Sequence, residues 1–315
     1  MSPGLIDRLL DKTIALSFDR TGYLRHARGF DPDDLDVDLT GRQIAVTGAN
    51  SGLGYATTAA LAARGATVWM LCRAARRGAD ARDRLLAAHP NADLRLQTVD
   101  VSDWDSVDTC GDDLPTDRLD VLVHNAGALV DERVVLPNGL ERTLATNLVG
   151  PYRLTHRLLG RLEAAPAPRV VHVSSGGMYG VKLDLGALEG TRGAFDGVKA
   201  YAYTKRGQVV LTEQLAQRWA DRGVAVHAMH PGWADTPGVK GSIPTFHALT
   251  QAILRTPEQG ADTTVWLAAI AEIPGPSGTF WFDRAPADPH LSRLTRVDDD
   301  VRARFWDQLQ DWAGV

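Results

Sequence analysis

Short apolar runs alternate along the chain with longer segments rich in alanine, leucine and arginine. Six runs are rich in β-branched residues, QIAVTG, ATVWMLC, LRLQTV, DVLVHNA, PRVVHVSS and GVAVHAMHPG, and a seventh, GTFWF, lies at 278–282. Strands that are apolar throughout are buried on both faces, as in a parallel sheet covered by helices. The pattern predicts a single α/β domain with a doubly wound, Rossmann-type parallel sheet of about seven strands and helices on both faces.

Helices are expected between the strands and at both ends of the chain. Those between the strands lie near 53–64, 79–88, 104–112, 139–164 and 199–221. Apolar residues at helical spacing predict two more helices, at 5–18 and near 298–312. We therefore expect an N-terminal helical extension (1–40), the sheet domain (41–285) and a C-terminal helical tail (286–315).

The composition is that of an ordinary globular protein. The 315 residues are 44% hydrophobic and 23% charged, and the net charge is -5. No basic run with interleaved aromatic residues suggests a nucleic-acid partner. Cys72 and Cys110 are the only cysteines, no apolar run is long enough to span a bilayer and no secretory signal is evident, so we expect a cytoplasmic protein. The nine histidines form no metal-binding motif, so no metal site is expected.

A glycine-rich turn, VTGANSGLGYA, connects the first strand to the first helix. Its glycines, Gly48, Gly52 and Gly54, let the backbone turn tightly, so that amide groups and a helix N-terminus face a pyrophosphate. The turn predicts a dinucleotide site that also includes Asn50, Ser51 and Leu53.

The end of the second strand indicates which nicotinamide dinucleotide is bound. An NAD site usually has a carboxylate there, whereas this chain has WMLCRAARRG, with Arg73 directly after the strand and Arg76 and Arg77 beyond it. A guanidinium suits a 2′-phosphate in bidentate geometry. Arg73 therefore favours NADP(H) over NAD(H).

A tyrosine and a lysine lie four residues apart in AYAYTKRGQ. On a helix, Tyr201 and Lys205 share a face, whereas Tyr203 has Gly207 at that spacing. A tyrosine hydroxyl has a pKa near 10 and is a poor base at neutral pH, but a neighbouring lysine cation lowers that pKa. Tyr201 is therefore the candidate acid/base for proton transfer at a carbonyl oxygen.

Further polar residues are expected at the same edge of the sheet. Ser174 and Ser175 end the fifth strand, and successive strand residues face opposite sides, so one of the two is expected to serve the site. Asn147 lies upstream in TLATNLVGPY, in a helix that flanks this edge.

Together these motifs resemble the short-chain dehydrogenase/reductase family over nearly all of 42–285. The glycine turn has that family's TGxxxGxG spacing. The resemblance implies that Tyr201 is the acid/base, that Lys205 also holds the nicotinamide ribose, and that Ser175 hydrogen-bonds the substrate oxygen. It also implies that Asn147 anchors a water for proton relay.

The resemblance also implies further cofactor contacts. The family holds the adenine ring at Asp100 and Val101, and small residues in HNAG let the backbone run close to the cofactor. The remaining contacts lie in HPGWADTPGV, where the chain turns under the nicotinamide and a threonine bonds the carboxamide or a phosphate. The residues in these two motifs are Asn125, Ala126, Gly127, Pro231, Gly232 and Thr236.

Two segments are expected to shape substrate choice. The stretch between Ser175 and Tyr201 is longer than in many family members, resembles that of retinol-dehydrogenase-like members and should form a loop over the pocket. Residues 233–256 are expected to form a lid or to pack on the sheet edge. Their apolar side chains, Trp233, Ile243, Phe246 and Leu249, favour a lipophilic substrate.

The expected function is that of an NADP(H)-dependent oxidoreductase, which interconverts a carbonyl and an alcohol by hydride transfer. The alternatives are a non-catalytic NADP(H)-binding regulatory protein and an isomerase or epimerase that keeps its cofactor. The complete Asn–Ser–Tyr–Lys set argues against the first, and the glycine spacing argues against the second. A homodimer through the helices at 139–164 and 199–221 is typical of the family.

Overall fold

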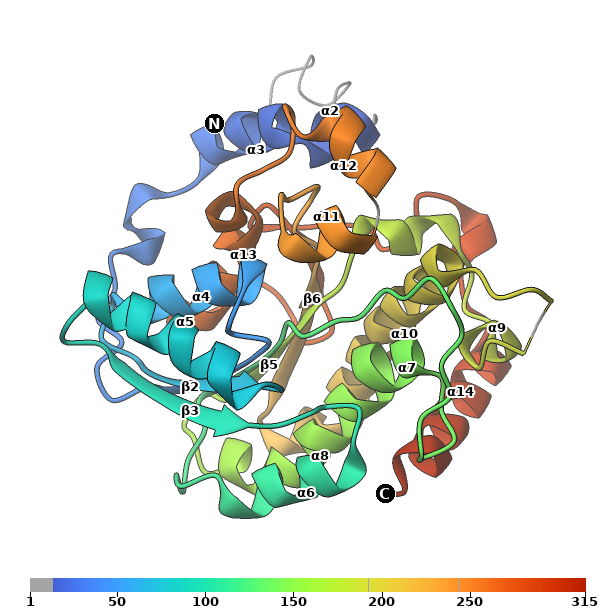
Figure 1. Cartoon of the computed structure of the whole chain (residues 1–315), viewed down its shortest axis with the longest axis horizontal. Helices are drawn as coiled ribbons and strands as arrows, with labels where there is room; N and C mark the ends of the chain where they lie inside the picture. Colours follow the sequence, from blue (N-terminus) through green and yellow to red (C-terminus); the bar gives the residue numbers. More distant parts are fainter. Residues whose placement is uncertain (1–13, 192, 243) are drawn as a thin grey trace.

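A single eight-stranded sheet forms the centre of the protein, whose computed structural model describes residues 14–191, 193–242 and 244–315 (Figure 1). The strands are β1 (Gln43–Thr47), β2 (Thr67–Cys72), β3 (Asp93–Thr98), β4 (Val121–His124), β5 (Arg169–Val173), β6 (Ala225–Met229), β7 (Phe280–Phe282) and β8 (Ala285–Pro286). Their order in the sheet is β3-β2-β1-β4-β5-β6-β7-β8, and all pairs are parallel except β7 and β8. The predicted doubly wound sheet is confirmed.

The eighth strand is the one that the sequence pattern does not predict. It forms a hairpin with β7 through Asp283 and Arg284, whose φ angles are 47° and 59°. Two consecutive left-handed residues make a two-residue turn whose twist matches its strands. Glycine or asparagine usually marks such a turn, and neither occurs here, so the sequence carries no hairpin signal.

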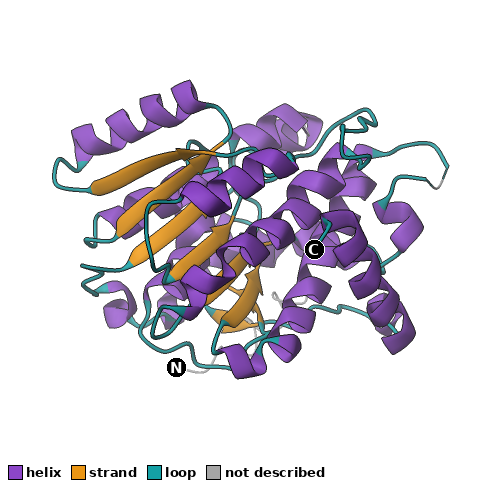
Figure 2. Cartoon of the chain, turned by 90° about the horizontal axis from the view of Figure 1, so that it is seen from below, coloured by secondary structure: helices purple, strands orange, loops and turns teal. Residues whose placement is uncertain are grey.

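Helices cover both faces of the sheet (Figure 2). One face carries α4 (Gly52–Ala62), α5 (Ala75–Ala88) and α13 (Pro257–Ala269), and the other carries α6 (Trp104–Asp113), α8 (Gly150–Glu163) and α10 (Gly197–Arg218). Along β1, Ile44 and Val46 belong to the hydrophobic core beneath α4, α5 and α13. Ala45, between them, belongs to the core beneath α6, α8 and α10. This alternation is what a strand buried on both faces requires.

The shorter helices lie in the connections and near the termini. They are α2 (Ile14–Phe18), α3 (Arg20–His26), η1 (Ala27–Gly29), η2 (Pro32–Leu35), α7 (Arg142–Leu144), η4 (Gly176–Gly180), α9 (Leu185–Leu188), η5 (Ala220–Arg222), α11 (Pro237–Ser242), α12 (Pro244–Thr250) and η6 (Arg293–Thr295). Of the helix predicted at 5–18, residues 5–13 lie outside the described residues. Over the described ranges, no helix combines the length and low charge that crossing a membrane requires.

The helix predicted at 139–164 is not one continuous α-helix. A π-helical turn, η3 (Ala145–Val149), separates α7 from α8 and contains Asn147. Directly after it, Gly150 lies so close to the segment that follows β3 that a Cβ there would be 1.7 Å from the carbonyl oxygen of Val101. A π-turn widens the helix locally and is often found at functional sites.

Helix α13 is missing from the sequence-based prediction because nearly all of it is buried. It packs against both α4 and the sheet, so most of its surface is buried and it has little amphipathic periodicity. A local signal was nevertheless present. Thr256 and Gln259 form a capping box, which marks the start of a helix in the sequence.

The N-terminal extension is attached to the domain by a buried guanidinium. Arg255 is 1% exposed and pairs with Asp283 at 2.5 Å. It also donates to the carbonyl oxygens of Ser17, Phe18 and Asp19 at 2.9 to 3.1 Å. The extension therefore crosses the carboxyl edge of the sheet beside α12, where α2 and α3 lie in Figure 1.

The helix predicted near 298–312 is α14 (Asp299–Ala313), and it packs on the body of the protein. Phe305 is fully buried in the core that α8 and α10 share. Trp306 lies edge-on to Tyr152 of α8, 5.6 Å away, and under the guanidinium of Arg218 of α10 at 4.1 Å. The tail thus covers part of the surface of both helices.

We predict that Arg255→Met lowers the free energy of unfolding by about 3–5 kcal/mol, because it leaves the buried Asp283 carboxylate without its main partner. Urea unfolding measures the change. The control is Arg304→Met, which removes an exposed ion pair with Asp300 and should cost less than about 0.5 kcal/mol. Equal effects of the two substitutions would contradict the structural role of Arg255.

Candidate active site

The glycine turn lies where β1 meets α4, and its geometry requires glycine. Gly48 and Gly52 have φ angles of 67° and 53°, in the left-handed region. At Gly54 a Cβ would lie 2.4 Å from both the Asn125 side-chain nitrogen and the Gly48 carbonyl oxygen. The backbone is therefore packed closely against the end of β4, and the N-terminus of α4 is left facing the carboxyl edge of the sheet.

Thr47 connects the glycine turn to the end of β4, and the sequence analysis did not identify it. Its hydroxyl accepts hydrogen bonds from the main-chain nitrogens of Asn125 and Ala126, both at 3.0 Å. In return, the Asn125 side chain donates to the Thr47 carbonyl at 2.9 Å. On the other side, a Cβ at Gly52 would meet the Thr236 side chain at 3.3 Å, so Thr236 lies beside the turn. This cradle of glycines and amides fits a dinucleotide pyrophosphate.

Arg73 and Asp100 lie together at the neighbouring strand ends. Arg73 follows β2 and is 62% exposed, with its Nε 4.0 Å from an Asp100 carboxylate oxygen. Asp100 also accepts hydrogen bonds from the main chain and the hydroxyl of Ser102. Val101 beside it is buried. The guanidinium is thus accessible at the place where a 2′-phosphate is expected.

Lys205 is buried at the centre of the site. It is 3% exposed, and its Nζ donates to the carbonyl of Val173 at 2.8 Å and to the side-chain oxygen of Gln208 at 3.2 Å. Burial lowers the pKa of Lys205 to about 7. A cation without a carboxylate partner loses hydration that two neutral acceptors replace only in part.

The Ser175 hydroxyl lies near the Tyr201 hydroxyl. Burial raises the pKa of Tyr201, and the nearby Ser175 hydroxyl opposes that rise. Burial is the largest influence on this pKa, and Lys205 Nζ lies 5.4 Å from the tyrosine ring centroid. Tyr201 is therefore held protonated at neutral pH. The expected effect of Lys205 on the pKa of Tyr201 stays a prediction.

The sequence offered two serines and two tyrosines as candidates, and the structure places the members of each pair differently. Ser174 is 2% exposed and donates to the carbonyl of Lys205 at 2.9 Å, so its hydroxyl is used within the protein. Ser175 is only half-buried and begins η4 by accepting from the nitrogen of Gly177. Tyr203 packs against the hydrophobic core. Of the two pairs, Ser175 and Tyr201 are the residues that meet.

Asn147 is fully buried in the π-turn and is held on all sides. Its side chain accepts from the nitrogen of Ala128 at 2.7 Å and donates to the Ala128 carbonyl and the Thr204 hydroxyl. Its main-chain carbonyl accepts from the side-chain nitrogen of Gln208 at 2.6 Å. A Cβ at Gly127 would lie 3.5 Å from the Asn147 side-chain oxygen and 3.7 Å from Lys205 Nζ. The structure thus brings Asn147, Gly127 and Lys205 together.

The N-terminal extension reaches this site through Phe18, which the sequence analysis did not identify. The ring is 6% exposed, and a Cβ at Gly176, next to Ser175, would lie 2.6 Å from it. The Phe18 carbonyl accepts from the nitrogen of Trp233 at 2.8 Å, and a Cβ at Gly232 would lie 2.6 Å from that oxygen. Phe18 therefore packs between two loops. One is the serine loop, which we define as Ser174, Ser175 and Gly176, and the other is the turn that begins at Pro231.

The two segments expected to shape substrate choice have different structures. The insert between Ser175 and Tyr201 folds as η4 and α9. The buried Arg206 of α10 donates hydrogen bonds to two main-chain carbonyls of this insert, those of Met178 and Val181. The lid region at 233–256 contains α11 and α12. Leu249 there is 82% exposed, so its side chain faces solvent; Ile243 and the side chain of Phe246 lie outside the described residues.

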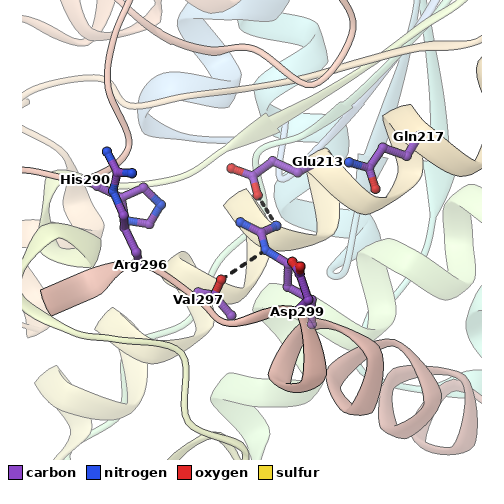
Figure 3. A pocket seen from close by; sticks show the side chains of 7 residues that line it. Glu213, Gln217, His290, Arg296, Val297 and Asp299 are labelled. Atoms are coloured by element: carbon purple, nitrogen blue, oxygen red, sulfur yellow. Dashed lines mark hydrogen bonds and ion pairs between the residues drawn. The ribbon is translucent and has the colours of Figure 1, made fainter. Parts of the chain in front are cut away.

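A separate pocket of about 510 Å³ lies between α10 and the C-terminal segment (Figure 3). It is lined by Glu213, Gln217, His290, Arg296, Val297, Asp299 and Arg302. Inside it, the guanidinium of Arg302 bonds Glu213 and the carbonyl of Val297. This pocket holds none of the predicted catalytic or cofactor-binding residues, and its ion pair attaches the tail to α10.

The chain matches the family model described as short chain dehydrogenase over residues 42–245. It belongs to the short-chain dehydrogenase/reductase family. Dehydrogenase/reductase SDR family member 12 of Bos taurus is 45% identical over 278 residues, which are 87% of this chain and 86% of the relative. Retinol dehydrogenase 12 of Bos taurus is 32% identical, over 86% of this chain and 90% of the relative. The protein is thus an oxidoreductase that acts on CH–OH groups.

Solved structures agree with this membership. A crystal structure of a Mycobacterium paratuberculosis protein has a TM-score of 0.72 and 26% identity, and covers 89% of this chain and 96% of its own. A protein of Beutenbergia cavernae assigned as an NAD(P)-dependent gluconate 5-dehydrogenase, with bound NADP, has a TM-score of 0.59 and 27% identity. The match covers 74% of this chain and 91% of that one.

We predict opposite effects for the two serines. Ser174→Ala should lower the free energy of unfolding by about 1 kcal/mol, because a buried hydrogen bond to Lys205 is lost, and should leave turnover within a few-fold. Ser175→Ala should leave stability nearly unchanged and lower turnover by about 10²–10³. Urea unfolding and NADPH consumption measure the two quantities. A catalytic loss confined to Ser174→Ala would reverse the assignment.

Proposed function

We propose that the protein is an NADP(H)-dependent oxidoreductase that interconverts a ketone or aldehyde and an alcohol by hydride transfer. The observation that carries the proposal is that Tyr201 lies near the Ser175 hydroxyl and beside the buried Lys205, whose Nζ is 5.4 Å from the tyrosine ring centroid. The nicotinamide would supply or accept the hydride. The protein must then move one proton at the substrate oxygen, and this cluster holds groups suited to that step.

Each residue has a role in this proposal. Tyr201 gives its proton to the substrate oxygen as that oxygen gains negative charge, and its raised pKa keeps the proton available at neutral pH. Ser175 stabilises the same oxygen as a hydrogen-bond donor. Lys205 would hold the nicotinamide ribose. Asn147 would connect Lys205 to solvent by way of a bound water, through a carbonyl lone pair that Gln208 does not use.

The cofactor would lie along the carboxyl edge of the sheet. Arg73 would bind the 2′-phosphate that distinguishes NADP(H) from NAD(H), which is consistent with the NADP bound to the Beutenbergia protein. The glycine turn would hold the pyrophosphate, and Asp100 and Val101 would hold the adenine. The other proposed contacts, on either side of the nicotinamide, are Asn125, Ala126, Gly127, Pro231, Gly232 and Thr236.

A lipophilic substrate is the class that we favour. Retinol dehydrogenases are among the relatives, and Phe18 and Trp233 place aromatic rings, with centroids 6.3 Å apart, beside the serine loop. We place the protein in the cytoplasm and keep 1–40, 41–285 and 286–315 as its three regions. A homodimer through α8 and α10 would have to include α14 in its interface, because α14 packs on both helices.

We predict that Tyr201→Phe lowers turnover by about 10²–10⁴ and changes NADPH affinity by less than about twofold, since the hydroxyl serves proton transfer. NADPH consumption with a panel of carbonyl compounds and fluorescence titration measure these quantities. Tyr203→Phe, on the same helix and packed against the core, is the control and should remain active. Full activity of Tyr201→Phe would favour the non-catalytic, regulatory alternative.

We also predict that Arg73→Ala weakens NADPH binding by about tenfold or more and leaves NADH binding nearly unchanged, because only NADPH carries the 2′-phosphate. Fluorescence titration with each nucleotide separates the two effects. Arg82→Ala, an exposed arginine on α5, is the control and should affect neither. An equal loss for both nucleotides would exclude Arg73 as the 2′-phosphate ligand.

A further inference from the structure

Gln208 links two members of the candidate site to each other. It lies three residues after Lys205 on α10, so both side chains share one face of the helix. Gln208 is completely buried. Its side-chain oxygen accepts from Lys205 Nζ at 3.2 Å, and its side-chain nitrogen donates to the main-chain carbonyl of Asn147 at 2.6 Å.

Chemistry determines which way this amide points. An ammonium group can only donate hydrogen bonds, and a carbonyl oxygen can only accept them. With the amide reversed, Gln208 would face Lys205 with a donor and Asn147 with an acceptor, and both contacts would be repulsive. A side chain with an acceptor and a donor at this spacing is therefore required, and glutamine provides both.

The surroundings of Lys205 make this contact important. Two titratable groups face it: Tyr201, from the same helix, and His172 of β5, whose pKa burial and the Lys205 charge lower to about 3. Asn147 and Thr204 are neutral. Among the described residues, no carboxylate pairs with Lys205. The carbonyl of Val173 and the amide of Gln208 are thus the two acceptors that compensate the buried charge.

We propose that Gln208 is a positioning residue, which holds the Lys205 ammonium in place and couples it directly to the Asn147 carbonyl in the π-turn. The link stabilises the charged form of the lysine without introducing a second charge. It also makes α10 and the π-turn move together, so that Lys205 and Asn147 keep a constant separation. The catalytic consequence rests on the function proposed above, whereas the link itself does not.

Lysine titration tests the link without a substrate. The chain has five lysines, so biosynthetic labelling of their ε-carbons with ¹³C gives few NMR signals, and Lys205→Met assigns the buried one. Gln208→Glu places a carboxylate beside the ammonium and should raise the pKa of Lys205 by about 1 unit or more. Gln208→Leu removes an acceptor and should lower that pKa.

The control is Gln214→Leu, which removes a largely buried glutamine of the same helix that donates to the Arg302 carbonyl. It should leave the titration of Lys205 unchanged. If Gln208→Leu fails to fold, the nearly isosteric Gln208→Glu still provides the test. A Lys205 pKa that stays within about 0.3 unit of the wild type in Gln208→Glu, or one that moves in the same direction in both variants, would overturn the proposal.

The pH dependence of NADPH affinity separates this inference from the proposed function. If charged Lys205 holds the ribose, NADPH binding weakens as the pH rises through the pKa of Lys205. In Gln208→Glu that loss should move to higher pH by the shift that NMR measures. An NMR shift with an unchanged binding profile would support the link and overturn the proposed role of Lys205.

Discussion

The end of β5 and helix α10 are joined at Lys205, and the geometry of the site depends on the contact that the Lys205 ammonium makes there. Lys205 Nζ donates to the carbonyl of Val173, and the Lys205 carbonyl accepts a second hydrogen bond, from the hydroxyl of Ser174, which adds stability. Ser175 is the next residue, and Tyr201 lies one helical turn before Lys205. The junction therefore brings the serine and tyrosine hydroxyls together. It does so with buried polar groups, whose loss is costly in a medium of low dielectric.

Burial also shifts the protonation equilibria of Tyr201 and Lys205. The pKa of Tyr201 is raised and that of Lys205 is lowered to about 7, because desolvation disfavours the phenolate and the ammonium alike. Both side chains are thus shifted toward their neutral forms. The lysine is near its titration midpoint at neutral pH, so small changes in its surroundings alter its charge. This sensitivity makes the amide of Gln208 more than a packing contact.

The N-terminal extension is part of the site rather than an appendage. Arg255 holds it with hydrogen bonds to three successive carbonyls and an ion pair to Asp283. As a result, Phe18 lies against Gly176 of the serine loop and against Gly232 of the turn that is expected to lie under the nicotinamide.

Local patterns in the chain were sufficient for the sheet, the glycine turn and the Tyr201–Lys205 pair. Continuous apolar strands, a strand–glycine–helix junction and an i, i+4 spacing each depend on a few consecutive residues. Helix α13 and strand β8 were missed, because a buried helix loses its amphipathic period and the hairpin turn has no glycine. The choice of Ser175 over Ser174 also required the structure, since both directly follow the same strand.

The sequence by itself thus determined the fold class, the glycine turn and the candidate residues for proton transfer, because these follow from short-range periodicity and spacing. Only the tertiary structure decided that Gln208 bridges Lys205 to Asn147, that Phe18 borders the serine loop, and that Tyr201 keeps its proton. These features arise from contacts between distant segments and from the depth of burial. No local pattern specifies either of them, because desolvation depends on everything packed around a group.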